Sequence, residues 1–215
     1  MQWSRRTVLG GLLLVPAGCA APNVDGSAPR LQPSIADDPY GEITTEPFPI
    51  EAVDLAERDP DLARQEVAFG KPYKPGTIVV SIPERRLYLV QSGGRAMRYA
   101  VGVGRAEALN FRGSAVIGRK AEWPTWTPTT NMIRAIPKYA AYASGMPGGA
   151  ENPLGARALY LYRGGVDTHF RLHGTIEPET IGTAVSSGCI RLVNQDIIDL
   201  YNRVPVGSQV VVLQS

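Results

Sequence analysis

The sequence predicts a mainly β protein, built as an antiparallel β-sandwich or barrel with one or two short helices. Its strand-like segments are short and closely spaced, and few helical patterns interrupt them, which is typical of this class. Glycine and proline, at 23 and 18 residues, make up almost a fifth of the 215 residues and indicate many turns. The hydrophobic fraction of 44% is enough for one packed core.

Several segments have the composition of strands, because β-branched and aromatic residues recur in them and turn residues bound them. In chain order they are Thr77–Ile82, Arg86–Gln91, Ala96–Val103, Ser114–Arg119, Arg157–Tyr162, Thr168–His173 and Gln209–Leu213. One clear helix is predicted at Gln195–Arg203, with Asn194 as its N-cap candidate. A second helical pattern covers Ile50–Ala68.

Residues 1–21 have the layout of an export signal. Arg5 and Arg6 precede a short apolar run, and small residues follow it. That run is shorter than the ~20 apolar residues that a membrane-spanning helix needs. The stretch Ser4–Leu9 resembles a twin-arginine signal, so we expect the protein in the periplasm or cell envelope.

The end of this signal leaves two alternatives open. Val15–Cys19 resembles a lipoprotein cleavage box, although Pro16 stands where such boxes usually carry leucine. In one alternative Cys19 is lipidated, and the lipid anchors the protein to the membrane. In the other, the signal is cleaved near Ala21 and no lipid is attached.

The rest of the chain divides into two parts. Residues 22–70 are rich in proline, alanine and acidic residues, and we expect them to form a tether or a strap over the domain. The composition changes at Lys71, so we place a globular domain at 71–215. After residue 19 the basic and acidic residues balance at 20 each and no basic run follows, which argues against nucleic acid as a partner.

Reactive side chains gather in two segments, Arg171–Thr175 (RLHGT) and Ser186–Leu192 (SSGCIRL). A thiol with its usual pKa of ~8.5 is only a few per cent thiolate at neutral pH, and a neighbouring imidazole can remove its proton. Cys189 and His173 therefore suit a nucleophile and its general base. The alternative is that both are structural residues, a small buried cysteine and a histidine with satisfied hydrogen bonds.

Two neighbours of Cys189 fit the same chemistry. Gly188 leaves room for a substrate carbonyl and for backbone N–H groups that stabilise a tetrahedral oxyanion. In an extended segment Arg191 points to the same side as Cys189. There its guanidinium would either lower the pKa of the thiol or hold a carboxylate of the substrate.

The motif HGT followed by SSGCIRL is similar to the signature of the L,D-transpeptidase catalytic domain family of YkuD type, usually written HGT…S-H-G-C-[IV]-R-L. The resemblance covers residues 72–213. Further segments that match the spacing of the family are Trp123–Pro128, Asn152–Leu161, Ile181–Gly182, Asn194–Arg203 and Val204–Leu213.

The resemblance implies a fold of the L,D-transpeptidase type and a catalytic domain at 71–215 that uses neither a cofactor nor a metal. It implies that Cys189 attacks the carbonyl of the diamino acid at the third position of a peptidoglycan tetrapeptide stem, with His173 as the base. D-Ala leaves, and an amine then takes the acyl group. That step forms a 3–3 cross-link, attaches an envelope protein or exchanges a free D-amino acid.

The resemblance places further residues around this pair. Backbone N–H groups of Gly188 and Cys189 would bind the oxyanion. The residues that would support the site are Gly174, Ser187, Gly188 and Arg191. The residues that would border the substrate cleft are Trp123, Trp126 and Met146.

Ser187 departs from the family pattern, which usually has histidine two residues before the cysteine. Two alternative functions therefore stay open: an L,D-carboxypeptidase or hydrolase on the same scaffold, and a cell-wall-binding module that has lost turnover. A zinc site formed by His169, His173 and Cys189 is disfavoured, because a strand would hold the two histidines ~13 Å apart. The run Val101–Glu107 (VGVGRAE) lacks the third glycine and the βαβ context of a dinucleotide-binding loop.

Overall fold

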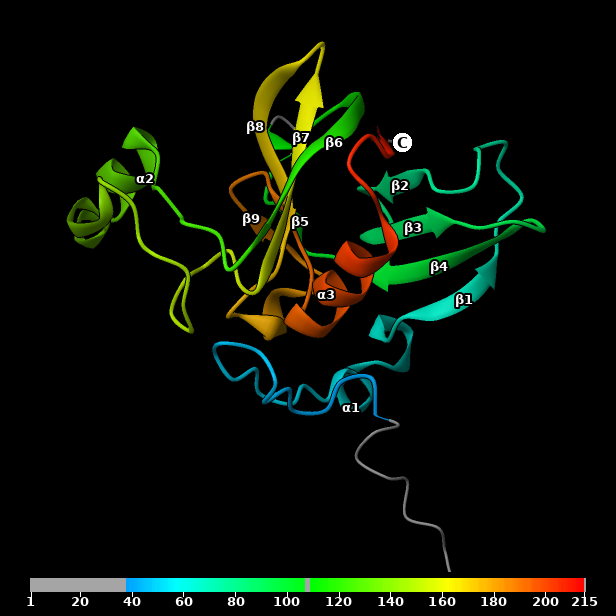
Figure 1. Cartoon of the computed structure of the whole chain (residues 1–215), viewed down its shortest axis with the longest axis horizontal. Helices are drawn as coiled ribbons and strands as arrows, with labels where there is room; N and C mark the ends of the chain where they lie inside the picture. The colour runs from blue at the N-terminus through cyan, green and yellow to red at the C-terminus, as the bar shows by residue number, and fades with distance from the viewer. Residues whose placement is uncertain (1–37, 107–108, 215) are drawn as a thin grey trace, which may run out of the picture.

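The computed structural model describes residues 38–106 and 109–214, and within them nine strands form one curved sheet (Figure 1). The strand order is β1-β4-β3-β2-β11-β6-β7-β8-β10. These strands are β1 Gln65–Ala68, β2 Ile78–Ser81, β3 Arg86–Val90, β4 Arg95–Ala100, β6 Gly113–Glu122, β7 Arg157–Arg163, β8 Val166–His173, β10 Ile190–Arg191 and β11 Gln209–Leu213. Two further strands, β5 Val103–Gly104 and β9 Ala184–Ser186, pair with each other. The mainly β fold class is confirmed.

The sheet is mixed, so the strictly antiparallel arrangement that we predicted is wrong. β11 runs parallel to β2 and β10 runs parallel to β8, whereas the other neighbours in the sheet are antiparallel. Parallel neighbours need long connections. Residues 174–189, which include the 3-10 turn η5 (Pro178–Thr180), provide such a connection between β8 and β10.

The sheet closes on itself through a bridge between β10 and the chain that leaves β4. The N–H and the C=O of Gly102 each bond Arg191 of β10, both at 2.9 Å. The β10 end of the strand order therefore returns to the β4 side of the sheet. As a result, the strands surround one core.

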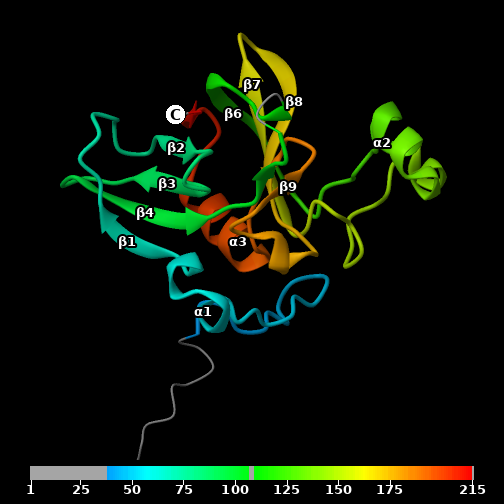
Figure 2. The ribbon, with the colours of Figure 1, turned by 180° about the vertical axis from the view of Figure 1, so that it is seen from behind.

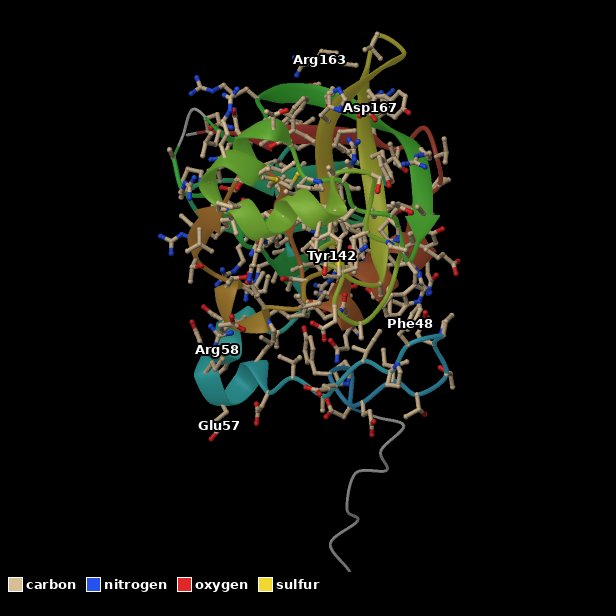
Figure 3. The ribbon with its side chains drawn as sticks, turned by 90° about the vertical axis from the view of Figure 1, so that its left-hand side faces the viewer. Phe48, Glu57, Arg58, Tyr142, Arg163 and Asp167 are labelled. Carbon is tan, nitrogen blue, oxygen red and sulfur yellow. The ribbon has the colours of Figure 1, made fainter. Side chains whose placement is uncertain are left out.

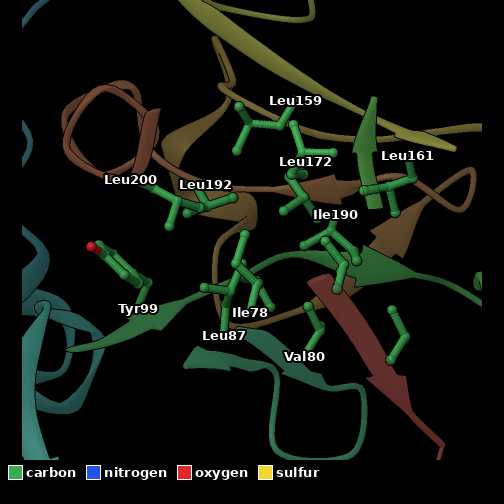
Figure 4. Packing of buried hydrophobic residues seen from close by; sticks show 14 of the residues in the cluster. Ile78, Val80, Leu87, Tyr99, Leu159, Leu161, Leu172, Ile190, Leu192 and Leu200 are labelled. Carbon is green, nitrogen blue, oxygen red and sulfur yellow. The ribbon is translucent and has the colours of Figure 1, made fainter. Parts of the chain in front are cut away.

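Apolar side chains from the inner face of the sheet and from the helix α3 fill this core. The buried residues labelled in Figure 4 are Ile78, Val80, Leu87, Tyr99, Leu159, Leu161, Leu172, Ile190, Leu192 and Leu200. Neighbouring residues of a strand point to opposite faces of the sheet. The residues that alternate with these on β8 and β10 are therefore left on the outer face.

α3 spans Asn194–Arg203 and buries Ile197 and Leu200 completely, which confirms the predicted helix. Its N-cap residue is Val193, so the prediction that Asn194 caps the helix is wrong. The side chain of Asn194 is instead committed to hydrogen bonds with two neighbouring segments, which leaves it unable to bond its own helix.

Residues 38–64, which we call the strap, cross the end of the domain next to α3 (Figure 1). The strap contains the short helix α1 (Leu55–Arg58) and the 3-10 turn η2 (Pro60–Leu62). The longer helix predicted at Ile50–Ala68 is wrong. The reason is that the extended backbone of Asp59, with φ of −168°, separates the two turns, and the chain then enters β1.

Polar contacts hold the strap on the domain. The carboxylate of Glu46 accepts two hydrogen bonds from the guanidinium of Arg157, at 2.6 and 2.9 Å. Arg64 forms an ion pair with the buried carboxylate of Asp196 at 3.1 Å. Arg58 donates to two backbone carbonyls of η5. Together these contacts connect the strap to β7, to α3 and to the connection that leads to β10.

Residues 123–150 form an arm that leaves β6, projects from the body and returns to β7 (Figures 1 and 2). The arm contains the helix α2 (Thr130–Ala135) and the 3-10 turn η4 (Pro137–Tyr142), and neither element has a buried residue. The backbones of Trp126 and Met146 exchange two hydrogen bonds near the base of the arm. The arm is therefore a surface element that adds nothing to the core.

Within residues 38–106 and 109–214, no helix has the length and apolar character needed to cross a membrane. The export signal predicted at 1–21 and the lipidation candidate Cys19 lie outside the described residues. The division of the chain at residues 22–70 and 71–215 stays a prediction.

Candidate active site

The pairing of β8 with β10 places the predicted nucleophile and base on one face of the sheet. Ile190 lies beside Leu172, and Arg191 lies beside His173. Because Ile190 and Leu172 point into the core, Arg191 and His173 point to the outer face. Cys189 comes one position before Ile190 and so points outward as well. Cys189 and His173 are diagonal neighbours on adjacent strands, a separation of ~7–8 Å that two side chains can span.

The thiol of Cys189 is half-buried and faces several groups that favour its anion. Burial raises the pKa of the Cys189 thiol above its usual value. A hydrogen bond from the backbone N–H of Arg171 and the positive charges of Arg171 and Arg191 act in the opposite direction. Because burial prevails, the thiol is protonated at neutral pH until a base removes its proton.

The orientation of the His173 imidazole leaves one ring nitrogen able to accept such a proton. Its Nδ1 lies 2.6 Å from the carbonyl oxygen of Gly174. Since a carbonyl can only accept, we assign the ring proton to Nδ1, which leaves Nε2 free to accept a proton. Burial lowers the pKa of His173 to about 4, and its residue is only 4% exposed, so the ring is neutral at pH 7. In the resting site a neutral thiol therefore faces a neutral imidazole.

A tight turn carries Cys189. Gly188 has φ of +126°, and a Cβ there would lie 2.3 Å from the carbonyl oxygen of Leu109. The buried hydroxyl of Ser186 accepts the Gly188 N–H at 3.1 Å and donates to the Cys189 carbonyl at 2.7 Å. The Gly188 N–H is thus already used within the turn. The N–H of Cys189 has no acceptor among the described residues and is the remaining donor for an oxyanion.

The two other predicted neighbours of the thiol differ in their surroundings. Arg191 forms an ion pair with Glu177 at 2.7 Å, so part of its guanidinium is already bound to a carboxylate. Ser187 is exposed, and its hydroxyl makes no hydrogen bond with the residues that the structure describes. The histidine position of the family is therefore occupied here by a small solvated side chain.

Asn194 holds the segment that orients His173, and our sequence analysis missed this role. Its Oδ1 accepts the N–H of Ala156 at 2.9 Å, and its Nδ2 donates to the carbonyl of Thr175 at 3.0 Å. A Cβ on Gly174 would lie 2.2 Å from the same Oδ1, so glycine is required beside this amide. The signal in the sequence was the polar residue at the start of α3, which we interpreted as a helix cap.

The model of the L,D-transpeptidase catalytic domain family, YkuD, matches residues 75–212. This chain belongs to that family. The match contains both the His173 strand and the Cys189 turn, and it includes β2 through most of β11.

Named relatives agree with the family assignment. The chain is 37% identical over 139 residues to the probable L,D-transpeptidase ErfK/SrfK of Escherichia coli, covering 63% of this chain and 43% of the relative. It is 38% identical over 146 residues to the probable L,D-transpeptidase YcfS of the same organism, covering 64% and 44%. The matched region thus spans less than half the length of these curated relatives.

A solved structure from Brucella melitensis is more similar in sequence. It is 49% identical, covers 73% of this chain and 97% of that chain, and has a TM-score of 0.50. It is named as a probable carnitine operon oxidoreductase caia, which is a statement about that protein alone. The similarity indicates that the two chains share one fold.

Of the residues predicted to border the cleft of this L,D-transpeptidase domain, Trp123 contacts the strap, whereas Trp126 and Met146 lie side by side near the base of the arm. The indole N–H of Trp123 donates to Glu46 at 2.9 Å, and its ring packs edge-on against Phe48 at 4.9 Å. Trp123 is therefore a contact of the strap. Trp126 packs against Tyr139 of the arm at 5.0 Å, next to its backbone partner Met146.

The β8 strand of this family member is less regular than we expected. Tyr162 pairs with Asp167 and Tyr160 pairs with Arg171, so β8 has two extra residues between the pairs. His169 lies in this bulge with φ of +63° and is exposed. The regular strand that we assumed between His169 and His173 is therefore interrupted at His169. Within residues 38–106 and 109–214, no group of three or more His, Cys, Asp or Glu side chains could hold a metal.

Proposed function

We propose that this chain is a cysteine L,D-transpeptidase that acts on the tetrapeptide stems of peptidoglycan. The observation that carries the proposal is the outward placement of Cys189 and His173 on adjacent strands, with Nδ1 of His173 held by Gly174. This arrangement leaves an unprotonated nitrogen on the same face as the thiol. Family membership and the named relatives support the same reaction.

Acylation begins with proton transfer. Nε2 of His173 takes the proton of the thiol as Sγ of Cys189 attacks the carbonyl of the third residue of the stem. The N–H of Cys189 donates to the oxyanion that forms. When the tetrahedral intermediate collapses, its C–N bond breaks, and the proton on His173 passes to the amine of the departing D-Ala. A thioester on Cys189 remains.

Deacylation reverses these roles. An amine attacks the thioester carbonyl, His173 accepts the proton of the amine, and the sulfur leaves and recovers a proton from His173. An amine of a neighbouring stem gives a 3–3 cross-link, and an amine of an envelope protein gives a protein attached to the wall. With water as the acceptor the same site would be an L,D-carboxypeptidase.

We further propose that the protein works in the periplasm or cell envelope. The basis is the arrangement of Arg5, Arg6 and the apolar run within residues 1–21. Changing both arginines to lysine should block export by a twin-arginine route, which fractionation of cells would detect. A palmitate analogue that labels the protein, but not its Cys19→Ala variant, would show a lipid anchor.

The reaction is tested by incubating the purified protein with disaccharide tetrapeptides and analysing the products by mass spectrometry. A cross-linked dimer with loss of D-Ala supports transpeptidation. Disaccharide tripeptide without dimer shows hydrolysis. Binding without any product would contradict an active enzyme and would favour the binding-module alternative. Ser187→His then separates the cases, because activity appearing only in that variant would show that Ser187 had abolished turnover.

A further inference from the structure

The outer face of the sheet carries a second feature beyond the thiol and its base. Arg119 of β6 lies beside Tyr160 of β7, and Tyr160 lies beside Arg171 of β8. Arg171 in turn lies beside Cys189 of the next segment, because Cys189 comes one position before Ile190, the partner of Leu172. One row of side chains therefore crosses the strands β6, β7 and β8 and ends at the nucleophile.

A β-bulge at Gly118 places Arg119 in this row. Ile117 pairs with Leu161 and Arg119 pairs with Tyr160, so β6 has one extra residue between the two pairs. Regular alternation would put Arg119 on the same inner face as the buried Ile117. The bulge turns Arg119 outward instead, and bulges next to active sites often redirect a side chain in this way.

The guanidinium of Arg119 is held in place by stacking. Its Cζ lies 3.6 Å from the centre of the Tyr160 ring, and Cζ of Arg171 lies 4.1 Å from the same centre. The tyrosine is only 5% exposed, so its ring is a fixed support. Stacking of this kind restricts the arginine side chain while leaving its N–H donors free for another partner.

The arginines on this face differ in their anionic partners. Arg171 binds both carboxylate oxygens of Asp167, at 2.7 and 2.9 Å, and Arg191 is paired with Glu177. Arg119 is exposed, and no carboxylate of the described residues lies within ion-pair distance of it. Asp167, which Figure 3 labels near the tip of the β7–β8 hairpin, is the second residue of β8 and the partner of Arg171. Among the described residues, the Arg119 guanidinium is thus without an anionic partner and is preorganised for a ligand.

The distance from Arg119 to the thiol matches the length of a short extended peptide. Arg119 and Cys189 are separated by three strand spacings of ~4.8 Å each, which is ~14 Å across the sheet. An extended peptide covers this distance in about four residues, and the arginine side chain shortens the span. A peptide stem that is bound at Cys189 is therefore long enough to bring one of its carboxylates to Arg119.

We propose that Arg119 binds a carboxylate of the peptide whose carbonyl is attacked by Cys189, and that it selects for stems carrying this carboxylate. The inference rests on the proposed function for the identity of the peptide. A guanidinium can bind a carboxylate through two parallel hydrogen bonds, and stacking on Tyr160 restricts the Arg119 side chain for such a contact. Arg191, which we considered for this role from the sequence, is already paired with Glu177.

The test measures binding rather than turnover. In a Cys189→Ala background, tetrapeptide stems are titrated by calorimetry, with one carboxylate at a time converted to an amide. We expect Arg119→Gln to weaken binding of the unmodified stem about 10- to 100-fold, as for loss of a charged hydrogen bond. One amidated stem lacks the carboxylate that Arg119 binds. For that stem, the Arg119→Gln variant and its parent should have the same affinity. Arg119→Lys should recover part of the loss.

The matched control is Arg163→Gln, since Arg163 is also exposed and stacks on an aromatic ring, that of Phe111 at 4.5 Å, rather than on Tyr160. This variant should bind all stems like its parent. Equal weakening of every stem by Arg119→Gln, or no weakening, would overturn the proposal. Failure of the proposed function would give a different result. Arg119→Gln would still weaken binding only of stems that carry the free carboxylate, but the protein that keeps Cys189 would release no D-Ala.

Discussion

Nδ1 of His173 lies 2.6 Å from the carbonyl oxygen of Gly174, so the imidazole is oriented by the next residue in the chain. This bond assigns the proton to Nδ1 and leaves Nε2 as the base. Any displacement of Gly174 should therefore rotate the ring and impair proton transfer.

The acid limb of the pH–rate profile should lie well below the usual histidine range. Burial lowers the pKa of His173 to about 4, and protonation removes its ability to accept a proton. The acylation rate should therefore hold as pH falls through ~6.5 and decline only near the lowered pKa. The pH dependence is measured from initial rates of D-Ala release across this range. Circular dichroism at the same pH values checks that the protein stays folded. An acid limb at ~6.5 would show that the ring is solvated during catalysis.

His173→Ala should lower the acylation rate by ~100-fold or more, because loss of a general base has this effect. The loss of acylation rate caused by Ser187→Ala should be smaller by at least about tenfold, since an exposed hydroxyl contributes at most one neutral hydrogen bond of ~1 kcal/mol. Iodoacetamide alkylation of Cys189 at several pH values provides a second readout. Equal losses in the two variants would place Ser187 among the catalytic groups.

Asn194→Ala should reduce kcat more than it changes KM, because the amide positions Gly174 and through it His173. The variant leaves the N–H of Ala156 and the carbonyl of Thr175 without their partner, a loss of ~1–3 kcal/mol in the free energy of unfolding. The control is Asn202→Ala, an exposed asparagine near the other end of α3. A fall in stability with unchanged kcat would show that the role of Asn194 is only structural.

Glu46→Gln should loosen the strap. Arg157 is 7% exposed at its side chain, and removal of the Glu46 charge leaves it only the exposed carboxylate of Glu122 at 3.8 Å, so we expect a loss of up to about 3 kcal/mol in the free energy of unfolding. The hydrogen bond from Arg157 holds the pKa of Glu46 below 4.5, so the pair stabilises the fold above that pH and loses its effect as pH falls through the lowered pKa. Urea unfolding at neutral and acid pH, with exposed Glu42→Gln as control, tests both points. An equal fall in the free energy of unfolding for Glu46→Gln and Glu42→Gln would contradict this prediction.

Much of the fold was predictable because its strands have clear local patterns. The segments Arg86–Gln91, Arg157–Tyr162 and Gln209–Leu213 correspond to β3, β7 and β11 within two residues. β10 has two residues and β9 has three, which is too short for a periodic pattern. The parallel pairing of β10 with β8 depends on the path of residues 174–189, and local composition does not encode that path.

The candidate site was predictable only in part. Cys189 and His173 are recognisable because their types and motif carry the chemistry. The roles of Asn194 and Arg119 depend on contacts between distant segments and on the bulge at Gly118, which shifts the alternation of β6 by one residue. The contact between Trp123 and the strap depends on the path of residues 38–64, which local composition does not encode.

The most direct test of the central claim is the mass of the enzyme during turnover. A tetrapeptide stem is mixed with the protein and quenched in acid at early times, and intact mass and peptide mapping follow. The account predicts an adduct equal to the stem minus D-Ala, attached to the peptide that contains Cys189 and sensitive to hydroxylamine as a thioester is. Cys189→Ala should show neither adduct nor D-Ala release. Release of D-Ala at an undiminished rate by Cys189→Ala would contradict the assignment of the nucleophile.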